Sequence, residues 1–216
     1  MKRRRIIFIF LAVLLAGLLV FCFIGPAEPT YKGRTLTSYL RGPWLQTDDT
    51  EKENPHFAPD IAAIRAIGTN GIPTLLRLIS AHDPPWKAKA ISWLNGQKLV
   101  RLEILSAREK RQLGFLGFHI LDELGSPAAP QLVKLLENSH VEVRMFVADV
   151  LLHMPAGKEA HLAAIKCLLM DSELRHVGIP LIDVFTRRFP TEAQLPDFRK
   201  LFDGTTNRPP SPGDGD

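Results

Sequence analysis

The sequence has few cysteines, and their positions exclude a disulfide-stabilised fold. Only Cys22 and Cys167 occur among 216 residues. Cys22 lies inside a long apolar run and Cys167 inside an amphipathic segment, so the two thiols are not placed to pair within one chain. Two cysteines also exclude the clustered thiolates of a structural zinc site. We interpret Cys167 as a small buried hydrophobic residue and expect packing alone to stabilise the domain.

Excess charge of either sign is missing from the body of the chain. The formal net charge is +4, and the first residues, Lys2, Arg3, Arg4 and Arg5, supply all of it. Of the 27 Lys and Arg residues, 23 remain, which equals the 23 Asp and Glu residues. A nucleic-acid-binding surface needs basic residues gathered on the folded part of the chain. The sequence therefore predicts no nucleic-acid partner.

Catalytic and cofactor-binding motifs are absent as well. The sequence contains no Gly-x-Ser-x-Gly, no His-Glu-x-x-His and no Gly-Lys-Ser motif. His119, Asp122 and Glu123 come nearest to a metal-ligand pattern, because helical positions three and four apart lie on one face. We interpret these three residues as a solvated polar face. The sequence predicts no enzyme activity, no catalytic residue, no cofactor and no metal site.

One long apolar run is present near the N-terminus. Residues 6–24 carry no charged side chain, and as an α-helix they span roughly 28 Å, close to the thickness of a bilayer core. The basic tip before the run favours a cytoplasmic N-terminus. We therefore expect residues 1–25 to form a signal anchor, with the remaining chain on the extracytoplasmic, periplasmic side. The small residues 25–27 loosely resemble a cleavage site, so secretion after cleavage stays open, whereas bulky Phe21 disfavours a lipid anchor on Cys22.

Proline and glycine divide the rest of the chain into three parts. Residues 26–57 are predicted to be an extended lead-in with one short helix around Leu36–Leu40. Residues 58–202 repeat apolar side chains at spacings of three and four, which is typical of short amphipathic helices, and no segment favours a strand. Residues 203–216 are rich in turn formers and predict a disordered tail.

The helical region repeats itself. Gly125 lies 57 residues after Gly68, and Pro130 lies 57 residues after Pro73. A glycine at the end of one helix and a proline at the start of the next are typical of a corner between two helices. A weaker third copy begins at Gly157. The pattern predicts a stacked helical repeat with a unit of roughly 32 to 40 residues.

Three local features accompany the repeat. The long offset between the first two copies predicts an inserted stretch, 95–111, whose own helix ends at Ala107–Arg111. We interpret Gly114 and Gly117 as sites of close packing between helices. Ser126 is interpreted as a helix-capping residue.

Leu124–Leu152 resembles the HEAT repeat. It has a helix ending in Leu-Gly, a corner proline, the segment Leu-Val-Lys-Leu-Leu, a loop, and Val-Glu-Val-Arg opening a second apolar helix. The resemblance covers Asp60–Phe189, and Tyr31–Leu40 resembles an element that precedes the repeats in membrane-tethered bacterial members. It implies an all-α fold, a short right-handed α-solenoid of about three helical hairpins. In HEAT repeats the arginine after the loop helps tie neighbouring units, and Arg144 matches it.

The same resemblance implies a function. Such solenoids act mainly as scaffolds for other molecules, which implies a membrane-anchored scaffold that binds a protein partner on the extracytoplasmic side. A structural organiser of an envelope assembly, or an enzyme such as a chromophore-lyase-like HEAT protein, stays as an alternative. The basic cluster of the insertion could meet anionic headgroups or an acidic partner. The candidate interaction residues are Arg108, Lys110, Arg111, Arg144 and Trp44.

Overall fold

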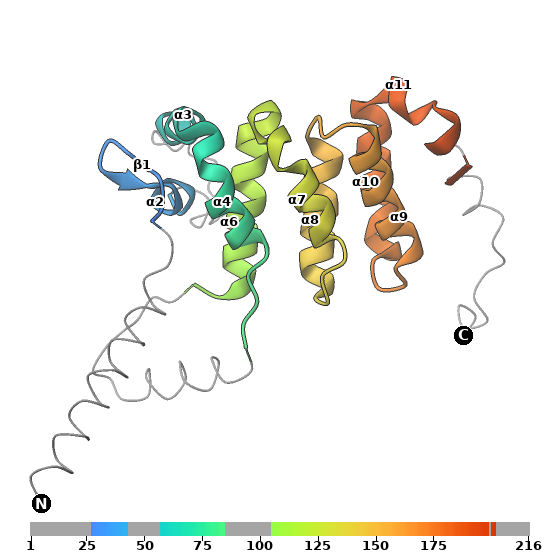
Figure 1. Cartoon of the computed structure of the whole chain (residues 1–216), viewed down its shortest axis with the longest axis horizontal. Helices are drawn as coiled ribbons and strands as arrows, with labels where there is room; N and C mark the ends of the chain where they lie inside the picture. The colour runs from blue at the N-terminus through green and yellow to red at the C-terminus, as the bar shows by residue number, and fades with distance from the viewer. Residues whose placement is uncertain (1–26, 43–56, 85–104, 199, 202–216) are drawn as a thin grey trace, which may run out of the picture.

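The computed structural model describes residues 27–42, 57–84, 105–198 and 200–201 (Figure 1). Helices dominate these residues, so the predicted mainly helical fold is confirmed. They are α2 (Leu36–Leu40), α3 (Phe57–Ile67), α4 (Ile72–Ile79), α6 (Ala107–Leu121), α7 (Ala129–Leu135), α8 (Val141–His153), α9 (Lys158–Met170), α10 (Arg175–Arg188) and α11 (Pro190–Ala193).

Several sequence predictions fall outside this part of the chain. They concern the anchor at 6–24, Trp44, the stretch 95–104 and the tail at 203–216. Among the described helices, none combines the length and the apolar composition needed to cross a membrane.

The longer helices form two layers (Figure 1). In one layer α3 packs on α6, α6 on α8, and α8 on α10. The other layer contains α4, which covers α6, together with α7 and α9, which pack on α8 and on each other. The core lies between the layers, where Leu75, Phe118, Leu132, Leu151 and Leu168 are almost fully buried.

Two short 3₁₀ turns form the predicted corners. η2 (Gly68–Gly71) joins α3 to α4, and η3 (Asp122–Ala128) joins α6 to α7. Each following helix has a proline in its first turn, Pro73 in α4 and Pro130 in α7. Proline fits there because the first amides of a helix have no partner within it.

The two corners differ in their backbone conformation. Gly68 has a φ of 57° in the left-handed region, whereas in the second corner that region is taken by Asp122, with a φ of 47°. Gly125 therefore does not adopt the left-handed conformation that Gly68 has at the equivalent position. Ser126 does not cap α7 either: its hydroxyl donates to the carbonyl oxygen of Pro155 at 3.1 Å. The capping prediction was wrong because the hydroxyl bonds the loop after α8.

Helix α6 begins where the sequence suggested that a helix ends. The amide of Glu109 donates to the Ser106 hydroxyl at 3.2 Å, and the amide of Ser106 donates to the Glu109 carboxylate at 2.7 Å. This reciprocal pair is a capping box, and its hydrogen bonds lower the pKa of Glu109. Ala107–Arg111 is therefore the first turn of α6, and the predicted inserted helix ending there was wrong.

Close packing between α4 and α6 depends on glycine. A Cβ atom at Gly114 would lie 2.7 Å from the main-chain nitrogen of Ile79, and one at Gly117 would overlap the side chain of Leu75. Such separations are shorter than van der Waals contact. The predicted role of these glycines in helix packing is confirmed.

Residues 27–42, the described part of the lead-in, fold onto the first helices instead of remaining extended. The strands β1 (Thr30–Tyr31) and β2 (Arg34–Thr35) pair antiparallel, which corrects the expectation of no strands. The predicted helix Leu36–Leu40 is confirmed as α2, which packs on α3 and α6. Arg34 pairs with Asp60 of α3 at 3.2 Å and stacks over the Tyr39 ring. Residues 27–42 thus cover the α3 end of the helical stack.

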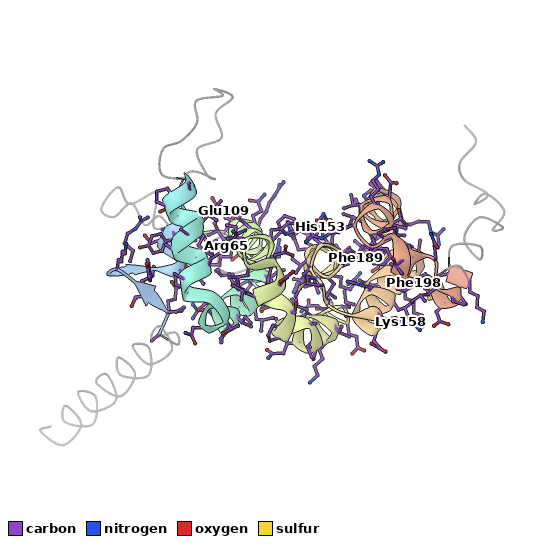
Figure 2. The ribbon with its side chains drawn as sticks, turned by 90° about the horizontal axis from the view of Figure 1, so that it is seen from above. Arg65, Glu109, His153, Lys158, Phe189 and Phe198 are labelled. Atoms are coloured by element: carbon purple, nitrogen blue, oxygen red, sulfur yellow. The ribbon has the colours of Figure 1, made fainter. Side chains whose placement is uncertain are left out.

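Aromatic residues close the other end. Phe185 of α10 lies between Phe189 and Phe198, with ring centroids 5.5 and 5.3 Å away, and His161 of α9 lies 5.1 Å away. Phe189 and Phe198 mark this end in Figure 2. Phe185 and Phe198 are fully buried, so the segment after α11 is part of the packed domain.

Candidate functional site

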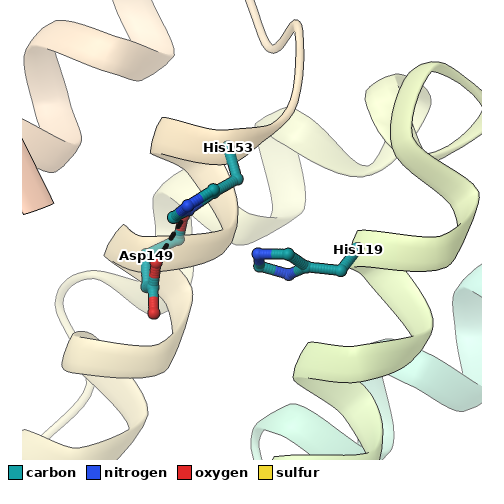
Figure 3. A group of neighbouring side chains, drawn as sticks. All are labelled: His119, Asp149 and His153. Atoms are coloured by element: carbon teal, nitrogen blue, oxygen red, sulfur yellow. Dashed lines mark hydrogen bonds and ion pairs between the residues drawn. The ribbon is translucent and has the colours of Figure 1, made fainter. Parts of the chain in front are cut away.

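Three side chains with metal-binding or proton-transfer chemistry meet between α6 and α8. His119 comes from α6, and Asp149 and His153 lie one turn apart on α8 (Figure 3). One ligand atom from each side chain lies within 4.8 Å of the other two. The cluster therefore links two neighbouring helices of the same layer.

Main-chain carbonyls fix the two imidazole rings. Nδ1 of His119 lies 3.2 Å from the carbonyl oxygen of Phe115, and Nδ1 of His153 lies 2.9 Å from that of Asp149. A carbonyl oxygen only accepts, so each Nδ1 carries a proton. In the neutral form of each ring, the lone pair is on Nε2.

The Asp149 carboxylate lies beside His153. Its Oδ1 atom is 2.8 Å from Nδ1 of His153, and the two side chains are 20% and 24% exposed. The single Nδ1 proton also faces the main-chain carbonyl, and no other described donor meets Oδ1 with hydrogen-bond geometry. The buried Oδ1 atom of Asp149 therefore has one described partner, Nδ1 of His153, whose proton is shared with a main-chain carbonyl oxygen.

A small cavity adjoins both histidines. Its volume is about 20 Å³, and it lies between α6, α8 and the end of α10. At its edge Arg188 pairs with Asp122 at 2.6 Å, so the carboxylate balances the charge of the guanidinium. The other lining residues are Phe118, His119, Val150, His153 and Met154.

The two histidines differ in their affinity for protons. Burial lowers the pKa of His119 from its ordinary value of 6.5, and the nearby positive charge of His153 adds to this effect. The hydrogen bond to Asp149 raises the pKa of His153, against the effect of burial. His119 is therefore predominantly neutral at pH 7.

The sequence pattern grouped His119 with Asp122 and Glu123, but in the structure His119 lies beside Asp149 and His153. Asp122 pairs with Arg188 of α10, and Glu123 is exposed, so neither converges with His119. The imidazole is half-buried against α8 and does not belong to a solvated face. The spacing of Asp149 and His153 on one helix is a detectable signal, but nothing in the sequence joins that pair to His119.

The predicted basic cluster is not a continuous exposed surface. Arg108 is exposed, and Lys110 is half-buried beside a hollow of about 560 Å³. Arg111 is only 5% exposed; it donates to the carbonyl oxygen of Ala81 at 2.7 Å and pairs with Glu142. The guanidinium of Arg111 fastens the end of α4 to α6 and α8, which leaves little of it open for the docking role predicted from the sequence.

Arg144 joins α8 to the loop before α10. Its Nε donates to Asp171 at 2.8 Å, its Nη1 to the carbonyl oxygen of Asn138 at 2.8 Å, and its Nη2 pairs with Glu173 at 3.2 Å. Its side chain is 15% exposed, so little of the guanidinium is open to a partner. This placement fits the linking role that the HEAT resemblance implies for this arginine.

Asp171→Asn is expected to lower the free energy of unfolding at pH 7 by about 1 to 2 kcal/mol, because it removes a charge-assisted hydrogen bond. Burial alone would raise the pKa of Asp171, but the hydrogen bond and charge of Arg144 hold it below the ordinary value of 3.8. A carboxylate with a lowered folded-state pKa stabilises the fold above its unfolded value, and this contribution is lost as the pH falls through the folded value. Urea unfolding of the full chain in detergent, followed by circular dichroism, should give a smaller difference at pH 3 than at pH 7.

Asp183→Asn is the matched control for this measurement. Asp183 pairs with Arg187 on the surface of α10, with side chains 56% and 79% exposed, and such pairs contribute little. A stability difference for Asp171→Asn that does not change between pH 7 and pH 3 would contradict the assignment.

Comparison with known proteins adds no family to this description. Models of protein families, curated proteins and solved structures were each compared with the chain, and none of them matches it.

Proposed function

We propose that this chain is a membrane-anchored, HEAT-like α-solenoid that binds a protein partner on the extracytoplasmic side of the membrane. The recurrence of a glycine-to-proline corner carries the proposal, although the residue in the left-handed conformation differs between the two copies. η2 joins α3 to α4 and η3 joins α6 to α7, and each is followed by a helix with proline in its first turn. Their glycines and prolines are separated by the same 57 residues. The two-layer packing of successive helices supports the same architecture.

The α7/α9 face is the surface that we assign to the partner. A groove of about 390 Å³ lies between these helices, with Val133, Ala163 and Cys167 among its lining residues and Glu137 and Lys166 also lining it. Met170 belongs to the same groove and is 73% exposed, the largest exposure among the described large apolar side chains. An apolar groove beside charged groups suits an apolar side chain of a protein partner, and methionine adapts readily to such contacts.

Site-specific photo-crosslinking tests this assignment. A photoreactive amino acid at position 170 of the full chain, in native membranes, should give a discrete adduct with one protein. Position 187 is the matched control, because Arg187 is 79% exposed but lies on α10 in the other layer. An absent adduct at 170, or the same adduct with equal yield at 187, would contradict a partner on the α7/α9 face.

The anchor is tested separately. If residues 6–24 span the membrane, the chain should resist extraction by alkaline carbonate and should keep its basic N-terminal tip. A mature chain that begins near Glu28 would mean secretion and would overturn the anchored form of the proposal. Neither result depends on the identity of the partner.

A further inference from the structure

We propose that His119, Asp149 and His153 form a binding site for a divalent transition metal ion, with Zn²⁺ as its typical occupant, that fastens α6 to α8. This site is independent of the proposed scaffold function. It lies between α6 and α8, apart from the α7/α9 groove and from the predicted interaction residues.

The donor set is the first argument. Two imidazole nitrogens and one carboxylate oxygen form a protein ligand set used by zinc, with a fourth position left for water or another group. Imidazole favours zinc and its neighbours in the transition series over Mg²⁺ or Ca²⁺, which take oxygen ligands. Ligand atoms around tetrahedral zinc lie roughly 3.3 Å apart. The observed limit of 4.8 Å is within reach of side-chain rotation.

The orientation of both imidazoles is the second argument. Metal-binding histidines usually donate their other ring N–H to a carbonyl or carboxylate group, which fixes the ring and its tautomer. His119 donates from Nδ1 to Phe115, and His153 donates from Nδ1 to the main chain of Asp149. Both rings are therefore held with Nε2 free to bind a metal ion.

The Asp149 carboxylate is the third argument. Its Oδ1 atom is buried beside Nδ1 of His153 at 2.8 Å, and the single proton there also faces the main-chain carbonyl oxygen of Asp149. An acceptor oxygen that shares its partner's only proton costs free energy, and rotation of the carboxylate toward a bound cation would give it a full partner. The carboxylate would also offset part of the positive charge of the ion.

Space and charge around the cluster complete the case. The cavity of about 20 Å³ beside His119 and His153 holds roughly one water-sized group, which fits a fourth ligand. Arg188 at its edge is paired with Asp122 at 2.6 Å. The nearest guanidinium therefore carries its own counter-charge.

Zinc titration of the full chain, untagged, metal-free and in detergent, tests the site. Calorimetry should detect one Zn²⁺ per chain, and Co²⁺ in its place should give the visible absorption of a tetrahedral centre with nitrogen and oxygen ligands. His119→Gln, Asp149→Asn and His153→Gln should each weaken zinc binding by about 100-fold or more, since even changes to the groups behind the ligands cost 10- to 100-fold. These substitutions keep the approximate size of each side chain, and circular dichroism checks that each variant is folded.

A second histidine pair supplies the matched control. His82 and His140 are exposed and stacked with ring centroids 5.4 Å apart, so they could bind zinc adventitiously. The double variant His82→Ala/His140→Ala should bind zinc as the unchanged chain does. Zinc binding lost in this variant, binding retained in all three cluster variants, or no saturable binding at all would each overturn the proposal.

Discussion

Replacing Phe185 by alanine is expected to lower the free energy of unfolding by about 3 to 5 kcal/mol, among the largest effects of a single substitution in a packed core. Phe185 is fully buried and its ring contacts aromatic rings from three other positions, His161, Phe189 and Phe198. Its removal leaves a cavity that these rings cannot fill without moving. The residues around α11 should lose their packing first, because Phe198 rests on the Phe185 ring.

Two measurements on the full chain in detergent separate this effect from a general loss of structure. Urea unfolding should show a lower midpoint, and hydrogen exchange should rise first in α9, α10 and the segment after α11. Val184→Ala is the control, since Val184 neighbours Phe185 on α10 but is 37% exposed. Equal losses in the two variants would contradict the assigned role of Phe185.

Gly114→Ala should also destabilise the fold, by about 1 to 3 kcal/mol or more, although alanine is the better helix former by about 1 kcal/mol. The new methyl group would lie 2.7 Å from the nitrogen and 3.0 Å from the Cα of Ile79, which are backbone atoms that cannot rotate away. The helices α4 and α6 must then separate, and the buried side chains between them lose contact.

Gly125→Ala is the matched control for this experiment. A methyl group there would meet Phe118, Met154 and Leu121 at 3.4 to 3.8 Å, which is ordinary contact. Urea unfolding should therefore show a much smaller change for Gly125→Ala than for Gly114→Ala. A stabilising effect of Gly114→Ala would mean that α4 and α6 are not held as closely as described.

Local signals in the sequence predicted much of the fold. The spacing of apolar residues placed α3 and α4, and the Leu36–Leu40 segment placed α2. The start of α6 was missed although its signal, Ser106 followed three residues later by Glu109, is present in the sequence. The two short strands were missed because two-residue strands carry no period that a sequence can show.

The candidate site was less predictable because it is a tertiary arrangement. Asp149 and His153 are four residues apart on one helix, which local reasoning can detect. His119 lies on another helix and meets them only through the packing of α6 on α8. Arg111 shows the opposite error: its place in a run of basic residues suggested exposure, but the turn of α6 directs it into the core.

Both ends of the described stack are covered, by α2 with its strands at one end and by Phe198 with α11 at the other. Helical arrays with open ends can join head to tail and grow into filaments, because each end offers an unsatisfied surface to the next molecule. Here the two end faces of the stack, which an open array would expose, are covered by other segments of the same chain. Copies of the protein should therefore not polymerise end to end, and any assembly should form through the sides of the stack.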